Sequence, residues 1–366
     1  MRLLICAGGT GGGVYPALAV LQAVADRVEN TLWVGGKGGM EAGLVARYQL
    51  PYAEISAAGV HGVGLRALPG NLVKLLRGYI ESRRILREFR PDALLFTGGY
   101  LAVPMALAGM KVNSLLYVPD IEPGMALKAL SRFADVITLT NAASKQYFNP
   151  GKKMAVTGYP TRADLRNIPR DAALSTFNLA QSLPVLLVIG GSKGAHSLNQ
   201  AVFDNLNALL GQMQVLHITG QLDWQTALEM KAGLPSAVAE RYQVRAYLHE
   251  EISAAFSAAS IVLSRAGAST LGELPLFGLP AILVPYPYSW RYQKVNADHL
   301  VKHDAAVILE NAELSGKLVA TLKGLLADEQ KLASMRSNMR ALATPNAAAA
   351  IADLLVELGS RKEGLK

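Results

Sequence analysis

Two glycine-rich stretches of the chain each directly follow a run of apolar residues. GGTGGG, residues 8–13, comes after residues 3–7, and GGSKG, residues 190–194, comes after residues 185–189. A glycine-rich turn between a strand and a helix leaves backbone N–H groups free at the N-terminus of the helix, where they attract anions. Each stretch is therefore a candidate phosphate site, although a tight turn without a ligand has the same pattern.

A third candidate follows the apolar run 261–264. Residues 267–270, Gly-Ala-Ser-Thr, are expected to open a helix, and their small side chains would let a diphosphate approach its N-terminus. Glu273 lies one turn further on, near the same end. Its carboxylate would accept hydrogen bonds from ribose hydroxyls, or alternatively would form a capping box with Ser269 or Thr270.

The first glycine stretch fits neither of two common nucleotide loops. The dinucleotide spacing Gly-x-Gly-x-x-Gly would need glycine where Val14 or Pro16 stands. The second expected strand also ends in glycines and lacks the acidic residue that holds a ribose in that motif. A Walker loop would need Gly-Lys-Ser or Gly-Lys-Thr at the right spacing, which is absent.

The elements that must position these loops form two similar series. Short, almost wholly apolar runs alternate with helical patterns, which is typical of parallel strands buried on both faces. The expected strands are residues 3–7, 31–34, 93–97, 114–118, 136–139 and 154–157, followed by 185–189, 214–219, 243–246, 261–264, 281–285 and 306–309. Each series amounts to one doubly wound α/β domain, and two such domains imply a ligand cleft between the carboxyl ends of their sheets.

Turn residues at 158–162 mark the break between the two series. We therefore expect one domain at residues 1–160 and a second at residues 161–342. Residues 343–366 include an Ala-rich helix that would cap either domain.

Composition narrows the class of protein. The 366 residues are 51% hydrophobic and 17% charged, which suits a soluble α/β protein. No apolar stretch predicts a transmembrane helix or a signal peptide. The single cysteine, Cys6, excludes an internal disulfide framework and a cysteine-ligated metal site, so we expect a cytoplasmic protein. The net charge of +8 favours an anionic partner, and nucleic acid is the least favoured because the chain has no zinc-finger spacing or RNA-binding motif.

Five motifs occur in a recognisable order: GGTGG, FTGGYLAVP, TGYPTR, GGSKGAHSLN and SRAGASTLGELPLFGLPAILVPYP. Together they resemble the MurG family over almost the whole chain. The resemblance implies a GT-B fold and transfer of N-acetylglucosamine from UDP-GlcNAc to the lipid-diphosphate acceptor lipid I. It also implies a peripheral enzyme on the cytoplasmic face of the membrane, without a tightly bound metal or cofactor, whose last helix returns to the first domain.

The resemblance also implies a set of donor contacts. Backbone near Leu248 and His249 would read the uracil, and Arg162 would lie near the nucleotide. Glu273 would hold the ribose, and Gln293 would reach the sugar hydroxyls. The remaining donor-binding positions are Thr10, Gly11, Gly12, Gly191, Ser192, Gly194, Gly267, Ala268, Ser269 and Thr270.

Two departures from the family pattern fall on the acceptor side. Gly13 stands where the family has histidine, and residues 117–120, Tyr-Val-Pro-Asp, replace a His-Glu-Gln-Asn loop. An inverting transfer needs a base for the acceptor hydroxyl and positive partial charge for the departing diphosphate. Asp120 is the first candidate for the base, with Glu122 and His61 as further candidates; each is alternatively an ordinary loop residue.

Residues 65–90 predict an amphipathic helix with seven Lys or Arg and two Glu residues. One interpretation is that this is an ordinary helix of the domain, with its charged face in solvent. Alternatively it holds anionic lipid head groups, at roughly 1 kcal/mol for each basic residue. The basic residues considered for that role are Arg66, Lys74, Arg77, Arg83 and Arg87.

Three other functions stay open from the sequence. In the first, the chain is a transferase that uses the same donor with a different lipid acceptor. In the second, it is a two-domain UDP-sugar epimerase. In the third, it binds a UDP-sugar without turning it over.

Overall fold

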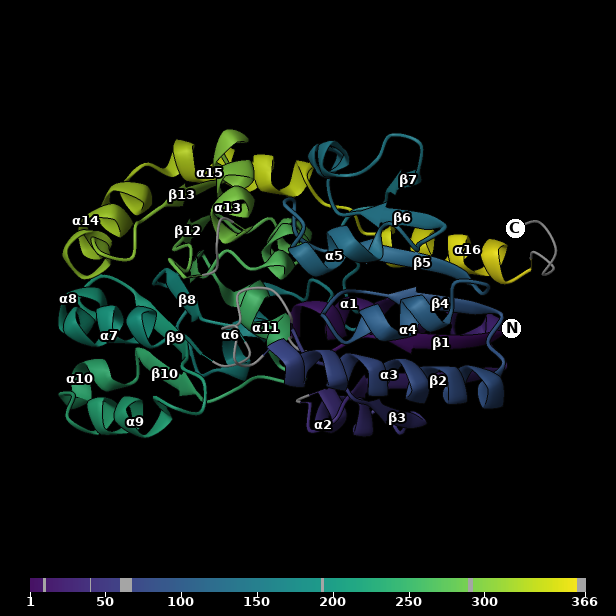
Figure 1. Cartoon of the computed structure of the whole chain (residues 1–366). Coiled ribbons are helices and arrows are strands. Elements are labelled where there is room, and N and C mark those ends of the chain that lie inside the picture. Colours follow the sequence, from purple (N-terminus) through teal and green to yellow (C-terminus); the bar gives the residue numbers. More distant parts are fainter. Residues whose placement is uncertain (9–10, 40, 60–67, 192–193, 289–291, 361–366) are drawn as a thin grey trace. The chain divides into compact units, whose positions relative to one another are not determined.

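The computed structural model describes the chain except for residues 9–10, 40, 60–67, 192–193, 289–291 and 361–366 (Figure 1). Its internal contacts divide the chain into two units. Unit 1 comprises residues 1–163 and 345–366, and unit 2 comprises residues 164–344. The chain passes between them after Ala163 and again after Thr344.

Unit 1 is built on a parallel sheet with the order β3-β2-β1-β4-β5-β6-β7. Its strands are β1 (Arg2–Cys6), β2 (Asn30–Gly36), β3 (Tyr52–Ile55), β4 (Ala93–Phe96), β5 (Asn113–Val118), β6 (Val136–Leu139) and β7 (Lys153–Val156). Its helices are α1 (Gly11–Val24), η1 (Ala25–Arg27), α2 (Glu41–Ala46), α3 (Leu68–Phe89), α4 (Ala102–Ala108), α5 (Met125–Leu130), η2 (Ala142–Tyr147) and α16 (Ala347–Gly359). The central strands are buried on both faces, as their apolar sequences predict.

Strand β3 was absent from the predicted set. Its sequence, Tyr-Ala-Glu-Ile, contains a charged residue, and only Ile55 is buried. This is the pattern of an edge strand, because an edge strand keeps much of its surface in water.

The last helix, α16, packs against α1, β4 and β5 of unit 1. Its buried face consists of Ala347, Ile351, Ala352, Leu355 and Leu358. At its edges Arg27 forms an ion pair of 2.6 Å with Asp353, and Asn113 Nδ2 donates a hydrogen bond of 2.9 Å to the Leu358 carbonyl. The C-terminal segment therefore completes the core of the unit in which the chain begins.

Unit 2 repeats the plan with a parallel sheet of order β10-β9-β8-β11-β12-β13. Its strands are β8 (Val185–Ile189), β9 (Gln214–Ile218), β10 (Tyr242–Arg245), β11 (Ile261–Ser264), β12 (Ala281–Leu283) and β13 (Ala306–Ile308). Its helices are α6 (Arg170–Thr176), α7 (His196–Asp204), α8 (Leu206–Leu210), α9 (Trp224–Ala232), α10 (Ser236–Ala239), α11 (Ile252–Ala258), η3 (Ala268–Leu271), α12 (Glu273–Phe277), α13 (Tyr292–Lys302), α14 (Leu314–Ala327) and α15 (Glu329–Ala341).

Each sheet has a point where the strand order reverses. In unit 1 the reversal lies between β1 and β4, and in unit 2 it lies between β8 and β11. Ligands of doubly wound sheets bind outside the carboxyl ends of the strands at such a point. The glycine-rich turns follow these strands, so their position makes them candidates for binding loops.

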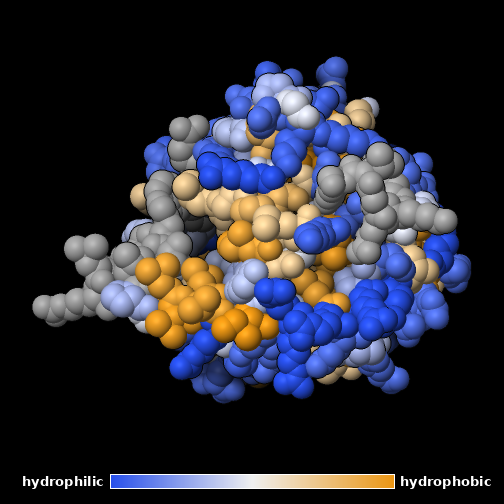
Figure 2. Space-filling model, turned by 45° about the vertical axis from the view of Figure 1, so that its right-hand side comes forward, coloured by the Kyte–Doolittle hydropathy of each residue, from blue (hydrophilic) through white to orange (hydrophobic). Residues whose placement is uncertain are grey.

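Helix α3 forms as predicted but exposes part of its apolar surface. Gly78 lies against β3, since a Cβ there would overlap the Ser56 carbonyl, and Ser82 is fully buried. On the opposite side Leu72, Val73, Leu76 and Ile80 are exposed, the last two to 61%. Figure 2 shows a face of the molecule on which apolar side chains gather next to strongly hydrophilic ones. We call these four residues the apolar stripe of α3.

A buried histidine lies in the core of unit 2. His217 on β9 is fully buried, and its ring hydrogen-bonds through Nε2 to Asn199 Oδ1 and through Nδ1 to the Tyr242 hydroxyl, both at 2.9 Å. Burial lowers the pKa of His217 to about 3, and the charge of Asp223 opposes this only in part. The folded protein therefore keeps this imidazole neutral.

Because His217 stays neutral in the folded protein, the free energy of unfolding depends on pH. Below about pH 6.5 the unfolded chain binds a proton at His217 that the folded chain does not bind. We therefore expect the free energy of unfolding to fall as the pH drops from about 6.5 toward 3, by up to about 1.4 kcal/mol per pH unit for this group. In NMR titration the ring protons of His217 should not shift between pH 8 and pH 4.5. A titration midpoint near 6.5 would contradict the assigned neutral core histidine.

Candidate active site

The glycine loops of unit 1 meet at the reversal between β1 and β4. Gly98 and Gly99 after β4 have φ values of +119° and +85°, which favour glycine. A Cβ on Gly99 would lie 2.9 Å from the Gly8 carbonyl, so the two loops touch. Gly11 and Gly12 open α1, whose first turn has no acidic residue, while Thr10 lies outside the described residues. This helix end is suited to an anion.

Gly13 is held in place by Thr97, the residue that follows β4. Thr97 Oγ1 donates a hydrogen bond of 2.7 Å to the Gly13 carbonyl, and a Cβ on Gly13 would lie 3.3 Å from both Thr97 oxygens. A side chain at position 13 would therefore press on the β4 loop.

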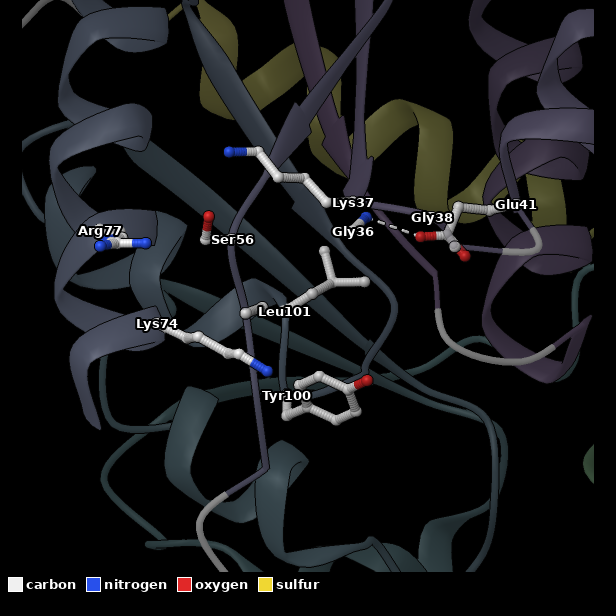
Figure 3. A pocket seen from close by; sticks show the side chains of 11 residues that line it. Gly36, Lys37, Gly38, Glu41, Ser56, Lys74, Arg77, Tyr100 and Leu101 are labelled. Carbon is white, nitrogen blue, oxygen red and sulfur yellow. Dashed lines mark hydrogen bonds between the residues drawn. The ribbon is translucent and has the colours of Figure 1, made fainter. Parts of the chain in front are cut away.

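A second set of glycines in unit 1 surrounds a buried carboxylate. Glu41 is 1% exposed, and its Oε1 accepts a hydrogen bond of 2.7 Å from the Gly36 nitrogen (Figure 3). A Cβ on Gly8, Gly35 or Gly39 would overlap the Glu41 side chain. The glycines that end β2 thus make room for an acidic residue of the chain itself.

The two candidate bases lie in the loop after β5. Because β5 is next to β4, this loop is at the same sheet edge as Gly98 and Gly99. Asp120 and Glu122 are both half-buried. Tyr117, at the end of the strand, bonds Thr140 through its hydroxyl at 2.6 Å, and burial together with the charge of Asp120 raises its pKa. The third candidate, His61, lies outside the described residues.

Arg162 lies beside the first helix of unit 1. Its guanidinium is 5.6 Å from the centre of the Tyr15 ring on α1, a cation–π contact. The next residue, Ala163, donates its N–H to Gln22 of the same helix. The TGYPTR motif therefore anchors the chain to α1 just before unit 2 begins.

The remaining basic candidates are on α3. Lys74, Arg77, Arg83 and Arg87 are exposed, and Arg66 lies outside the described residues. None of the described helices is both long enough and apolar enough to span a membrane.

The donor candidates of unit 2 converge on the reversal between β8 and β11. These strands are parallel neighbours, and residues 190–194 and 265–270 follow them. Gly191 and Gly194 have φ values of +90° and +77°. A Cβ on Gly194 would overlap the Thr219 carbonyl, so the fold itself requires this glycine. Ser192, between them, lies outside the described residues.

Gly267 differs from Gly194, because neither its backbone conformation nor its packing requires a glycine. Its φ of −66° suits any residue, and a Cβ there would have no neighbour within 4 Å. The open space lies beside the first turn of η3, where Ala268, Ser269 and Thr270 follow. This is room that a ligand can fill.

The helix expected to open at residue 267 is not continuous, which corrects the sequence prediction. Residues 268–271 form the 3-10 helix η3, and α12 starts separately at Glu273. The two N-cap positions are Gly267 and Gly272, so neither Ser269 nor Thr270 caps a helix with Glu273. Thr270 instead donates its hydroxyl to the Gly267 carbonyl at 2.6 Å. Neither Ser269 nor Thr270 is thus the N-cap of a helix, and the half-buried Glu273 carboxylate lies at the start of α12.

Gln293 and Arg265 organise the loop after β12. Gln293 Oε1 accepts a hydrogen bond of 2.9 Å from the Tyr286 nitrogen, which fixes the Gln293 side chain at this loop. Arg265 donates to the Val284 carbonyl and to Ser197 Oγ, and its guanidinium is 5.2 Å from the Tyr286 ring centre. These bonds join the ends of β11 and β12 to the start of α7.

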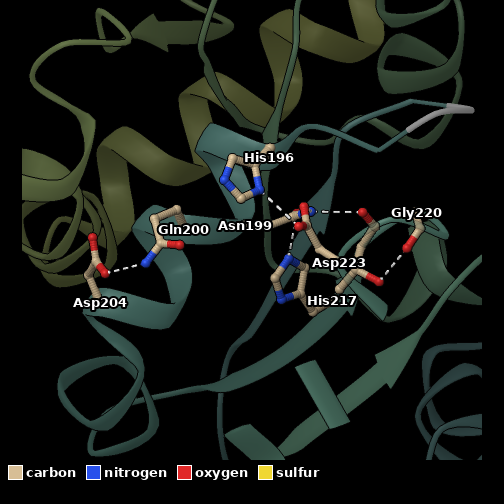
Figure 4. Close-up of polar contacts among 8 residues, drawn as sticks. His196, Asn199, Gln200, Asp204, His217, Gly220 and Asp223 are labelled. Carbon is tan, nitrogen blue, oxygen red and sulfur yellow. Dashed lines mark hydrogen bonds and ion pairs between the residues drawn. The ribbon is translucent and has the colours of Figure 1, made fainter. Parts of the chain in front are cut away.

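Sequence reasoning missed a histidine next to the donor glycines. His196 is the first residue of α7, and its Nδ1 lies 2.8 Å from Asp223 Oδ1 (Figure 4). Asn199 Nδ2 donates to the other Asp223 oxygen at 2.6 Å. The His196 side chain is 77% exposed whereas that of Asp223 is 12% exposed. The GGSKGAHSLN motif contains this histidine, but its partner Asp223 is 27 residues away, and no local pattern links them.

The proposed uracil segment follows β10. Leu248 is buried, and the ring of His249 lies 4.6 Å from that of Tyr247, centre to centre. Within the residues that the structure describes, no group of three or more His, Cys, Asp or Glu side chains is placed to hold a metal ion.

Comparisons with known proteins identify relatives of the whole chain. The glycosyltransferase family 28 N-terminal domain matches residues 3–138, and the family 28 C-terminal domain matches residues 185–354. A protein of Roseiflexus sp. (strain RS-1), named UDP-N-acetylglucosamine--N-acetylmuramyl-(pentapeptide) pyrophosphoryl-undecaprenol N-acetylglucosamine transferase, is 38% identical over 99% of this chain and 96% of its own length.

Comparison with solved structures agrees with these family matches. The crystal structure of Acinetobacter baumannii MurG superposes with a TM-score of 0.76 at 27% identity and covers 97% of this chain and 99% of its own. A UDP-N-acetylglucosamine 2-epimerase structure from Listeria monocytogenes has a TM-score of 0.71 at 11% identity, with 96% of this chain and 94% of its own covered. At that identity the epimerase shows a shared fold alone.

Proposed function

The chain belongs to the MurG family of N-acetylglucosamine transferases, and from this premise we propose that it transfers N-acetylglucosamine from UDP-N-acetylglucosamine to a lipid-linked N-acetylmuramyl-pentapeptide. The observation that carries the proposal is the pair of loops at the β8–β11 reversal, where a Cβ on Gly267 would have no neighbour within 4 Å among the described residues. A diphosphate bound there would lie against backbone N–H groups and small side chains.

The chemistry that we propose is a single displacement with inversion. The acceptor hydroxyl attacks the anomeric carbon, its proton passes to Asp120, and the bond from that carbon to the diphosphate oxygen breaks. Partial positive charge from backbone N–H groups at the glycine loops stabilises the departing diphosphate. His196, held by Asp223, adds a hydrogen-bond donor beside Gly194.

Product analysis separates this proposal from its alternatives. The full chain is incubated with UDP-N-acetylglucosamine alone and with UDP-N-acetylglucosamine plus the lipid-linked acceptor. We expect UDP release only when the acceptor is present. Isomerised or hydrolysed donor without acceptor would favour epimerase chemistry, and binding without turnover would favour a UDP-sugar-binding protein.

The same proposal places α3 at the membrane surface. The apolar stripe exposes four side chains in a row along one helix, and Arg83 and Arg87 lie further along that helix. Apolar side chains inserted at the lipid interface and basic residues near anionic head groups reinforce each other. A lipid-linked acceptor would then reach the enzyme without leaving the bilayer.

Flotation with vesicles tests the membrane surface. We expect the double variant Leu76→Asp/Ile80→Asp to bind anionic vesicles at least about tenfold more weakly, because each residue contributes roughly 1.5 kcal/mol or more when buried. Leu222→Asp is the control, since Leu222 is 87% exposed but belongs to unit 2. Binding that ignores these variants, salt and anionic lipid would contradict the proposed surface.

A further inference from the structure

Unit 1 contains a cavity of about 410 Å³ that has no assigned role in the transfer proposed above. Its volume lies in the range of ligand sites. The walls come from the turn after β2, the end of β3, one side of α3 and the turn after β4 (Figure 3). All three strands end at the sheet edge that carries the glycine loops of this unit.

The basic side chains that line the cavity outnumber the one carboxylate in its lining, that of Glu41. Lys37 lies 2.5 Å from Glu81, which offsets its charge, and hydrogen bonds from Lys37 and Ser56 outweigh burial and lower the pKa of Glu81. Lys74 and Arg77 also line the cavity, yet within the described part of the chain neither forms a hydrogen bond or an ion pair. In Figure 3, Lys74 extends from α3 toward Tyr100. An anionic ligand would therefore meet two available cations and an aromatic ring.

The cavity adjoins the first glycine loop directly. Glu41 and Leu101 both line it, and a Cβ on Gly8 would overlap both side chains. One side chain would thus separate the cavity from a sugar bound at the loops after β1 and β4. Residues 36–39, three of them glycines, supply backbone along one wall with almost no side chain to block it.

We propose that this cavity binds the carboxylate-terminated end of a peptide carried by the acceptor sugar. The inference rests on the proposed function, because the acceptor named for the relatives bears a pentapeptide as well as a diphosphate. The diphosphate of the acceptor would bind at the N-terminus of α1, whose first turn has no acidic residue. The peptide offers the other anionic group, its terminal carboxylate, for Lys74 and Arg77, and backbone groups for the glycine wall.

Acceptor analogues test the inference without a membrane. Initial rates are measured with short-chain, water-soluble acceptors that carry a free-acid pentapeptide, a pentapeptide amide or no peptide. With the wild-type chain we expect a KM about tenfold lower for the free-acid acceptor than for the other two. Lys74→Gln/Arg77→Gln should raise the KM for the free-acid acceptor about tenfold and leave the other two unchanged. Lys111→Gln/Arg84→Gln removes one exposed Lys and one exposed Arg of the same unit outside the cavity and should change none of the three.

The outcomes separate the inference from the function on which it rests. Equal KM values for the three acceptors in the wild type would overturn the inference while the transfer itself stands. A Lys74→Gln/Arg77→Gln variant that loses affinity equally for all three would also overturn it, because the two cations would then bind the diphosphate or the lipid. A wild-type chain that transfers to no acceptor would contradict the proposed function, and the inference would fall with it.

Discussion

Replacing Asp120 by Asn should lower kcat by about 100-fold or more while the KM for the donor stays unchanged. The substitution keeps the size of the side chain and removes the group that would take the acceptor proton. Asp120 follows β5 and lies at the sheet edge shared with Gly98 and Gly99, where an acceptor would bind.

Glu122→Gln is the matched control for this prediction. Glu122 is in the same loop, is likewise half-buried and loses the same charge on substitution. If Asp120 is the base, the Glu122 variant should keep kcat within about threefold of the wild type. A large loss only in the Glu122 variant would move the role to that residue. Equal loss of donor affinity in Asp120→Asn would show that the residue serves the donor site.

The second large effect is expected at Gly267. Gly267→Val should raise the KM for UDP-N-acetylglucosamine roughly 100-fold, because branched carbon atoms would occupy the space that we assign to the diphosphate. The melting temperature should hardly change, since the backbone there suits any residue and a Cβ would touch nothing within 4 Å. The prediction therefore separates a glycine kept for a ligand from a glycine kept for the fold.

Two further glycines calibrate this result. Gly194→Ala should lose both stability and donor binding, because its φ is +77° and its Cβ would overlap the Thr219 carbonyl. Gly316→Val, on an open side of α14, should change neither. Both measurements use thermal unfolding and donor kinetics. A Gly267→Val variant with unchanged donor KM would place the diphosphate elsewhere.

The strands could be predicted because their sequences are decided locally. Val136–Leu139, Val185–Ile189 and Ile261–Ser264 match their predicted ranges, since a buried parallel strand must be apolar on both faces. β3 was missed because an edge strand tolerates Glu54 and so loses that signal. The positions of the glycine loops followed from the strands, since parallel strands carry their loops at one sheet edge.

Features that depend on distant contacts were beyond sequence reasoning. The glycines after β2 signalled only the lack of a ribose-binding acid, whereas in the fold they surround Glu41. The periodicity of α3 distinguished two faces but not which apolar residues would be buried, and Leu76 and Ile80 are exposed. The bonds that join His196 to Asp223 and Asn199 to His217 span 27 and 18 residues. No local spacing encodes such partners.

The central prediction is transfer to the lipid-linked acceptor by a chain with glycine at position 13. It is tested most directly by incubating the full chain with radiolabelled UDP-N-acetylglucosamine and lipid I in anionic vesicles. We expect label in a disaccharide lipid with a β-configured new linkage, the product of inversion at the anomeric carbon. Donor that binds but leaves all of its label in UDP-N-acetylglucosamine or in free sugar would contradict the account.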